Sequence, residues 1–353
     1  MAGFTKLALG DHHSVILKQN GSVWSTDIDK PGAVASYPKR FVQFFSSGAM
    51  AVAAGQGNSL VLKQDGSLWG IGRNSRGQLG DGTRHRKDIF AYVKTIHSAK
   101  AVALGGAHSM VLTHQGTVWS TGWNAHGQLG DGSIYARTRF VITISSGVGA
   151  LAAGYGHSVV LKEGGSVWAT GRNYNGQLGD GSKIDRNSFV EVMPDGAVDI
   201  SAGGYHSMVL KEHGSVWATG WNEFGQLGDG STTDLASYVQ VISMVKSIAA
   251  GGRHSMVLKQ DGSVWATGYN IYGQLGDWSK NSRSDFVQVV SGGAKVVAAG
   301  MYHSMVVKED GSIWGTGLNK HGQLGDGPII SEPTFVRFVP FGNGARHDTI
   351  LHA

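Results

Sequence analysis

Residues 203–231 read Gly-Gly-Tyr-His-Ser-Met-Val-Leu-Lys-Glu-His-Gly-Ser-Val-Trp-Ala-Thr-Gly-Trp-Asn-Glu-Phe-Gly-Gln-Leu-Gly-Asp-Gly-Ser, and variants of this stretch recur along the whole 353-residue chain. One tryptophan of the stretch recurs seven times at spacings of 45 to 50 residues: Trp24, Trp69, Trp119, Trp168, Trp217, Trp265 and Trp314. A fixed period of this size indicates a repeat architecture in which no unit buries its apolar faces alone. The sequence therefore predicts one domain, residues 1–353, built from seven repeats.

Each repeat has the pattern of four short strands. In the fifth repeat we expect them at residues 199–202, 206–211, 215–219 and 238–241, with a hairpin turn at 212–214 and a long loop at 223–237. The second strand is apolar on both faces, since Met208 and Leu210 alternate with Val209. Sheets with two dry faces are packed between neighbours, and four-stranded sheets stacked radially form a β-propeller. The predicted fold is all-β, a seven-bladed β-propeller of four-stranded antiparallel blades.

The two ends of the chain depart from the repeat. The first repeat is degenerate after Trp24, where residues 27–31 replace the long loop. In the last repeat we expect a fourth strand at residues 335–339, and residues 345–351 then begin another unit. We expect this tail to pair near the N-terminal unit and to help close the ring, because closure removes open strand edges.

Composition limits the possible functions only weakly. The 55 glycines fall at fixed places in the repeats, and the net charge of +5 permits an acidic partner without requiring nucleic acid. The absence of cysteine excludes disulfides and thiolate catalysis. No apolar run reaches membrane-spanning length, and residues 1–6 lack the apolar core of a signal peptide, which favours an intracellular location without naming a compartment.

The repeat pattern resembles that of the regulator of chromosome condensation family. The motif is Gly-x-His-Ser-x-x-Leu-Lys-x-x-Gly-x-Val-Trp-x-x-Gly-x-Asn-x-x-Gly-Gln-Leu-Gly-Asp-Gly, and its Gly-Gln-Leu-Gly-Asp part begins at Gly77, Gly127, Gly176, Gly225, Gly273 and Gly322. The resemblance implies a seven-bladed propeller that uses one surface to bind a protein. It also raises guanine nucleotide exchange on a Ran-like GTPase as an alternative function. The residues two before each repeated histidine include no tryptophan, which argues against the light-sensing members of the family.

Strand alternation places the first-to-second connection and the third-to-fourth loop of every blade at the same end of the propeller. Aromatic residues and arginine, the types enriched in protein-binding hot spots, occupy the positions that the repeat leaves variable at this end. The predicted binding residues are Arg73, Arg76, Trp123, His126, Arg172, Trp221, Phe224, Arg253, Tyr269, Tyr272 and Tyr302. The opposite end, with turns such as 64–66 and 212–214, has the mixed charge of ordinary solvated surface.

The invariant positions of the repeat have structural interpretations. We expect the seven tryptophans to pack between blades and the repeated histidine, replaced by Asn58 in one copy, to hydrogen-bond a neighbouring blade. The alternative for the histidines is a ring of metal ligands or bases. We expect the aspartates of the Gly-Asp-Gly turns to cap those turns, because one carboxylate per loop is too few for a calcium site.

These observations predict a monomeric, soluble protein-interaction module or assembly subunit with no catalytic residues, metal site or cofactor. Guanine nucleotide exchange is the alternative. Chromatin or nucleic-acid binding is a third hypothesis, because nine basic residues could form a partial rim after the long loops: Arg84, Arg86, Lys87, Arg137, Arg139, Lys183, Arg186, Lys280 and Arg283. The interspersed aspartates make scattered surface charge the simpler interpretation of that rim.

Overall fold

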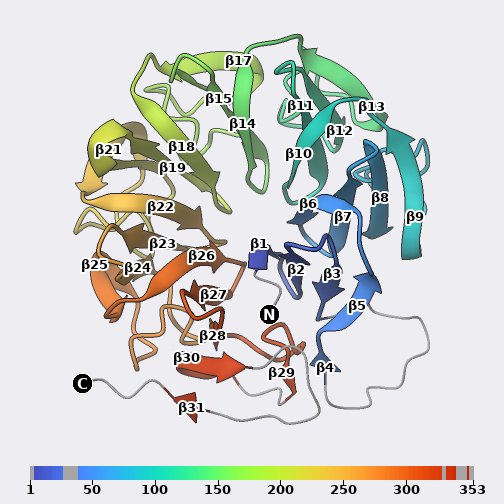
Figure 1. The fold of residues 1–353 in the computed structure, drawn as a ribbon. Helices are drawn as coiled ribbons and strands as arrows, with labels where there is room; N and C mark the ends of the chain where they lie inside the picture. The colour runs from blue at the N-terminus through green and yellow to red at the C-terminus, as the bar shows by residue number, and fades with distance from the viewer. Residues whose placement is uncertain (1–3, 27–38, 328–330, 339–347, 350–353) are drawn as a thin grey trace.

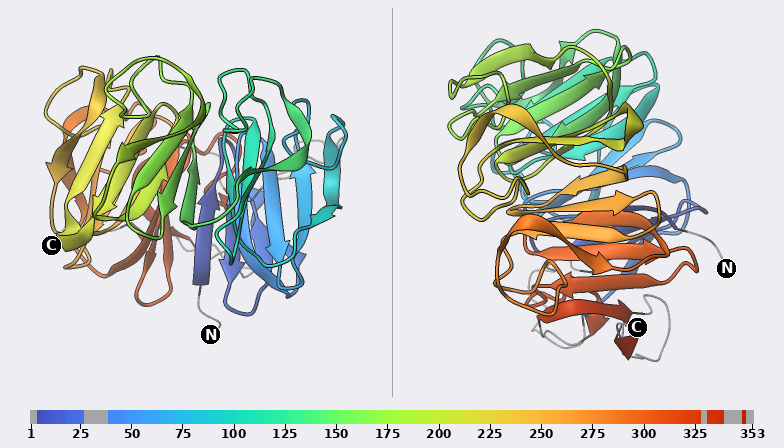
Figure 2. Two further views of the ribbon diagram at one scale, coloured as in Figure 1. Left: turned by 90° about the horizontal axis from the view of Figure 1, so that it is seen from above. Right: turned by 90° about the vertical axis from the view of Figure 1, so that its left-hand side faces the viewer.

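The computed structural model describes residues 4–26, 39–327, 331–338 and 348–349. Seven antiparallel sheets follow one another around a central axis, each with its first strand innermost (Figure 1). The side-on views show the sheets standing next to each other, with their connecting loops gathered at the two ends of the ring (Figure 2). The predicted all-β, seven-bladed propeller is confirmed.

The first four blades each contain four strands, paired in chain order. Blade 1 has β1 (Phe4–Leu9), β2 (Ser14–Lys18), β3 (Val23–Ser25) and β5 (Val42–Phe45). Blade 2 has β6 (Ala49–Ala54), β7 (Asn58–Lys63), β8 (Ser67–Gly72) and β9 (Lys87–Thr95). Blade 3 has β10 (Ala99–Leu104), β11 (His108–Thr113), β12 (Val118–Gly122) and β13 (Arg137–Ile144). Blade 4 has β14 (Val148–Ala153), β15 (His157–Lys162), β16 (Val167–Gly171) and β17 (Arg186–Met193).

The remaining blades repeat this order. Blade 5 has β18 (Ala197–Ala202), β19 (His206–Lys211), β20 (Val216–Gly220) and β21 (Leu235–Ile242), with a 3-10 turn η1 (Glu212–Gly214) in its hairpin. Blade 6 has β22 (Val245–Ala250), β23 (His254–Lys259), β24 (Val264–Gly268) and β25 (Arg283–Val290). Blade 7 has β26 (Ala294–Ala299), β27 (His303–Lys308), β28 (Ile313–Gly317), β30 (Glu332–Phe338) and the short β31 (Asp348–Thr349).

The fourth strands are longer than the sequence pattern predicts. In blade 5 the second strand has the predicted bounds, but β21 begins three residues before the expected start at Tyr238. In blade 7, β30 likewise begins before Phe335, whereas Val339 lies outside the described residues. The register between β20 and β21 shifts twice, so the apolar alternation that marks a strand is interrupted within the element.

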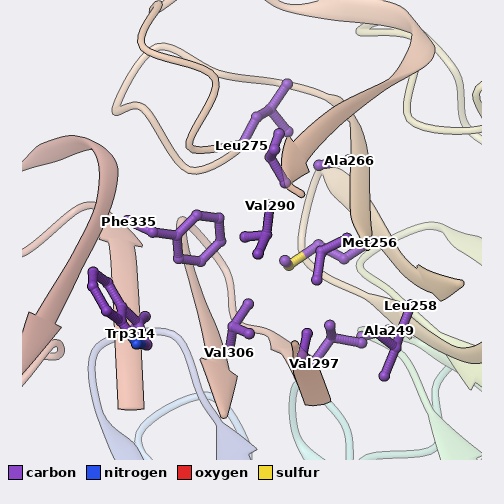
Figure 3. Packing of buried hydrophobic residues seen from close by; sticks show 13 residues of the cluster. Ala249, Met256, Leu258, Ala266, Leu275, Val290, Val297, Val306, Trp314 and Phe335 are labelled. Carbon is purple, nitrogen blue, oxygen red and sulfur yellow. The ribbon is translucent and has the colours of Figure 1, made fainter. Parts of the chain in front are cut away.

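Both faces of every blade are buried against neighbours, as the sequence predicts. Met208 and Leu210 pack with Ile248 and other residues of blade 6, whereas Val209 packs in the opposite direction into the cluster shared with blade 4. Figure 3 shows the equivalent cluster between blades 6 and 7, where Phe335 and Trp314 meet Val290 and Met256.

The repeated tryptophans pack on the preceding blade, which confirms the structural interpretation, but most of them are only half-buried. Trp217 packs against the cluster of blade 4, and its indole nitrogen donates to Ser215. Its ring is covered by Lys211, whose ammonium nitrogen lies 5.2 Å from the ring centroid. Each tryptophan therefore lies between the interblade core and a lysine stem at the hairpin end.

A buried polar contact joins successive blades. The Ser255 hydroxyl of blade 6 donates to the Gln226 carbonyl oxygen of blade 5 at 2.7 Å, and His206 Nε2 lies 2.8 Å from the same hydroxyl. We call this arrangement the His–Ser–Gln clamp. It is complete at five interfaces, where the serine is Ser14, Ser158, Ser207, Ser255 or Ser304. The prediction that the repeated histidines hydrogen-bond a neighbouring blade is confirmed.

The clamp also closes the ring. Ser14 of blade 1 contacts His303 Nε2 and donates to the Gln323 carbonyl oxygen of blade 7, as at any other interface. A short pair, β29 (Asp326–Gly327) with β4 (Lys39–Arg40), adds backbone hydrogen bonds there. Asp348–Thr349 pair with β30 on the outer side of blade 7, and most of the expected tail, residues 345–347 and 350–351, lies outside the described residues. A role of the tail in closure stays a prediction.

Candidate functional site

The first-to-second connections and the third-to-fourth loops meet at one end of the propeller, as strand alternation requires. In blade 5 the Tyr205 ring, between β18 and β19, lies 5.8 Å from the Trp221 ring that follows β20. We call this end of the ring the loop face.

Each third-to-fourth loop of blades 2 to 6 is held in one shape by its own polar side chains. In blade 5 the Asn222 side chain accepts from the Leu227 N–H and donates to Asp229, and the Gln226 side chain accepts from the Phe224 N–H. Asp229 also accepts from the Ser231 N–H, which confirms that these aspartates cap their turns. The invariant Asn, Gln and Asp thus fix the backbone from which the variable side chains project.

An aromatic cluster occupies the loop face over blades 5, 6 and 7. Trp221 lies 5.3 Å from Phe224, and Phe224 lies 4.6 Å from Tyr269 of blade 6. Tyr272 and Tyr302 continue the chain of contacts at ring separations of 5.3–6.4 Å. All five rings are half-buried, so they form a packed surface rather than separate projecting side chains.

Arg253 lies among these rings. Its guanidinium carbon is 5.3 Å from the Trp221 ring and 5.6 Å from the rings of Phe224 and Tyr269. Tyr302 lies slightly farther away, at 6.0 Å. Cation–π contacts of this kind hold the cation over the ring faces. We call these six residues, Trp221, Phe224, Arg253, Tyr269, Tyr272 and Tyr302, the aromatic–arginine cluster.

The contacts continue towards the axis through residues of blade 4. Arg172 lies over the Tyr205 ring at 4.9 Å, and Tyr155 stacks on Tyr205 at 5.6 Å. The Tyr155 hydroxyl donates to Asp11 of blade 1 at 2.8 Å, across the mouth of the central channel. Burial raises the pKa of Asp11 to about 6, against the lowering effect of hydrogen bonds from Tyr155 and Gln56.

The other predicted binding residues lie apart from the cluster. Trp123 and His126 form a separate edge-to-face pair in blade 3, and His126 Nδ1 is 2.7 Å from a carboxylate oxygen of Asp185. Arg73 and Arg76 are exposed on blade 2, and in the described part of the chain no aromatic contact joins either of them to the cluster. The structure therefore brings seven of the eleven predicted residues together: the six residues of the cluster and Arg172, which is connected to the cluster by way of Tyr205. The other four lie on blades 2 and 3. A binding role for any of them stays a prediction.

Two features of this face are absent from the sequence prediction. Tyr155 bridges to a residue 144 positions away, which no local pattern could indicate. Large apolar side chains are also exposed on the third-to-fourth loops: Ile134 56%, Tyr135 73%, Tyr174 71%, Ile184 65%, Ile271 52% and Trp278 48%. Tyr174 and Ile271 lie just before the Gly-Gln-Leu-Gly-Asp motif and the other four lie just after it, in positions that vary between repeats. That variability was the available indication.

The predicted basic rim is largely neutralised. Lys87, Arg137, Arg186 and Arg283 each form an ion pair with the aspartate of their own loop at 2.7–2.9 Å, and Arg86 pairs with Asp88. At Asp131, burial raises the pKa, but hydrogen bonds from Ser133 and Arg137 hold it below its ordinary value. Five of the nine rim residues therefore have an internal partner.

Within the described part of the chain, no group of three or more His, Asp or Glu side chains is placed to hold a metal ion. Likewise, none of the helices described there is long and apolar enough to cross a membrane.

The repeat and the ring of seven blades agree with a comparison against protein families, in which the RCC1-like domain matches residues 47–350. The chain belongs to the RCC1-like domain family. As an RCC1-like propeller it superimposes on human WBSCR16 with a TM-score of 0.76 at 22% identity, over 84% of this chain and 83% of that one. The comparison with curated protein sequences gave no match.

A second RCC1-like structure in the comparison is Prp20p of Saccharomyces cerevisiae, described with its binding properties to Gsp1p and histones. Its TM-score is 0.74 at 19% identity, over 87% of this chain and 84% of that one. Yeast RCC1 (Prp20) bound to Kap60 has a TM-score of 0.71 at 22% identity, over 81% and 74% of the two chains. At these identities the likeness establishes the fold.

Proposed function

We propose that this RCC1-like propeller is a non-catalytic protein-interaction module that binds its partner on the loop face, with the aromatic–arginine cluster at the centre of the contact. The observation that carries the proposal is the cluster itself. Five rings and a guanidinium from three blades form one contiguous surface at the end of the ring where the repeat varies. Contiguous aromatic and arginine side chains are the usual composition of an energetic hot spot.

The rigid loop framework supports this proposal. Because Asn222, Gln226 and Asp229 fix the loop backbone, Trp221 and Phe224 lose little conformational freedom when a partner binds. The relatives are consistent with protein binding, since Prp20p is described with Gsp1p, histones and Kap60 as partners. Guanine nucleotide exchange remains the second candidate. It is supported only by family membership and by the fold likeness to Prp20p.

The test is capture of a partner from extract of the native cells, followed by reconstitution with the purified partner. The loop-face variant is the double substitution Trp221→Ala, Arg172→Ala. The matched control replaces exposed residues of the hairpin end, Glu163→Ala and Gln260→Ala. We expect the loop-face variant to lose at least tenfold in affinity, about 1.4 kcal/mol or more, and the control to bind like the wild type.

Folding has to be compared alongside binding. Trp217→Ala removes a ring from the interblade core and should lower the free energy of unfolding by about 3–5 kcal/mol, whereas Trp221→Ala should lower it much less. Equal losses in urea unfolding would contradict the assignment of the two tryptophans. A nucleotide-release assay with a Ran-type GTPase separates exchange from plain binding, and binding lost by the hairpin-end control instead would move the site to the other face.

A further inference from the structure

Arg253 is held by aromatic rings but has no anionic partner. In the described residues no carboxylate lies within ion-pair distance of its guanidinium, and its Nε is buried without a hydrogen-bond partner. The side chain is half-exposed, so part of the guanidinium faces solvent. Aromatic faces stabilise a cation electrostatically but accept its N–H groups poorly, and a guanidinium carries five such donors.

The arginines of the rim show what this residue lacks. Arg137, Arg186 and Arg283 each bind the aspartate of their own loop through two nitrogens, Nε and a terminal nitrogen, at 2.7–2.8 Å. Each of those guanidinium groups therefore has an anionic partner within the chain. Arg253, oriented by four rings, has no such partner, and because its Nε is buried, its two terminal nitrogens are the donors that a partner can reach.

We propose that Arg253 is the anchor for a carboxylate of a protein partner, an Asp or Glu side chain flanked by apolar residues. This inference rests on the proposed function and specifies the chemistry of its partner. A carboxylate matches the guanidinium fork with two parallel hydrogen bonds, and the surrounding rings exclude water and strengthen the attraction. The apolar neighbours of the acidic residue would pack on Trp221, Phe224 and Tyr272.

The surroundings favour a carboxylate on a protein over the phosphates of a nucleic acid. A phosphate backbone is bound by several cations in succession, and its affinity falls steeply with salt. Here a single guanidinium lies within a patch of rings, and five of the nine rim cations are already paired. A single guanidinium surrounded by apolar surface therefore matches a single carboxylate that is itself flanked by apolar residues.

The test begins with selection of binders to the full chain from a random library of twelve-residue peptides. We expect the enriched peptides to carry an Asp or Glu beside aromatic or aliphatic residues. The affinity of one such peptide, measured by fluorescence anisotropy, should fall at least tenfold with Arg253→Met, which keeps the length of the side chain and removes its charge. Arg253→Lys should recover part of the loss. Lys320→Met, which removes an exposed cation from a third-to-fourth loop on the same face, should leave the affinity unchanged.

Replacing the acidic residue of the peptide by its amide should lower the affinity for the wild-type protein by the same factor as Arg253→Met does. The same replacement should change the affinity for the Arg253→Met variant little. Peptides without an acidic preference, or binding that falls with Trp221→Ala but not with Arg253→Met, would overturn the anchor and leave the proposed function standing. Peptides whose affinity is unchanged by Trp221→Ala and by Arg253→Met would overturn both the anchor and the proposed function. Binding of a DNA duplex, or self-association on sedimentation, that Arg253→Met abolishes would reassign the site and overturn the inference.

Discussion

The Ser255 hydroxyl determines which ring nitrogen of His206 carries the proton. Its proton goes to the Gln226 carbonyl oxygen, so the hydroxyl oxygen must accept from His206 Nε2. Burial lowers the pKa of His206 to about 4, so near neutral pH the imidazole is uncharged and its single proton is on Nε2. The sequence predicted a structural histidine, but the identity of its partners depends on how two blades face each other.

At this scale we predict that Ser255→Ala lowers the free energy of unfolding by about 2 kcal/mol or more. The substitution leaves the buried His206 N–H and the Gln226 carbonyl oxygen without partners. Ser166→Ala is the matched control, because that hydroxyl only accepts from the half-buried Trp168 indole, and it should cost less than about 1 kcal/mol. Urea unfolding of the two variants measures the difference, and similar losses would show that the clamp contributes little.

The Gly-Gln-Leu-Gly-Asp loops are the elements that set the distance between blades. Gly127 of blade 3 lies on the first residues of β17 in blade 4, and a Cβ built on it would lie 2.3 Å from the Asn187 Cα. Gly132, at the end of the same loop, has nearly the same φ, +79° against +80°, but its nearest such neighbour is 3.8 Å away. The sequence shows that both glycines recur, yet only the structure separates a conformational requirement from a close approach.

For these elements we predict that Gly127→Ala destabilises the protein by about 1–3 kcal/mol more than Gly132→Ala. Both variants strain a left-handed backbone equally, whereas the first also forces two blades apart. Thermal unfolding monitored by tryptophan fluorescence measures the comparison. Equal destabilisation would mean that the interface relaxes around the added methyl group.

The seven blades together form a ring whose acid stability should depend on its buried histidines. Burial lowers the pKa of His108 and His206 to about 4, and that of His157, His254 and His303 to about 3. The folded-state values lie below the ordinary value of 6.5, so folding favours the neutral ring. The stabilisation is complete above pH 6.5 and is lost as the pH falls towards the folded-state values. Asp11 acts in the opposite direction, because its pKa is raised.

For the whole molecule we predict that the free energy of unfolding falls steeply between pH 6.5 and pH 4.5. At pH 5 the contribution of each of the five histidines to the free energy of unfolding would be lower by about 2 kcal/mol than at neutral pH. The sum of the five losses is comparable with the stability of a domain. Asp180 of the blade 4 loop titrates lower: burial raises its pKa, but hydrogen bonds from Ser182 and Arg186 hold it below the ordinary value of 3.8. Urea unfolding across this range checks the slope, which His206→Asn should reduce. A flat profile would contradict the neutral-histidine interpretation.

Recognising the proposed binding site also required the structure of the whole ring. The sequence identified the variable positions and the end of the propeller on which they lie, because period and strand alternation determine both. It could not show that Arg253 of blade 6 lies among rings of blades 5 and 7, or that Trp123 lies apart, since these contacts depend on the rotation between blades. Two interfaces have only part of the clamp. Between blades 1 and 2 the His13–Ser59 contact is present without the glutamine, and between blades 2 and 3 the Ser109–Gln78 contact is present without the histidine. In the sequence these differences are visible only as the missing loop after Trp24 and as Asn58 in place of histidine.

The ring is closed by the same clamp that joins any two neighbours, and each described blade takes its strands from one continuous stretch of chain. Each blade therefore corresponds to one continuous segment of the sequence. A genetic exchange of residues 197–242 would replace one complete blade. Such an exchange would bring Trp221 and Phe224 with it and leave Arg253 and Tyr269 to the next cassette. If the proposed binding surface spans these blade boundaries, exchange of whole repeats would change the surface and leave the scaffold unchanged.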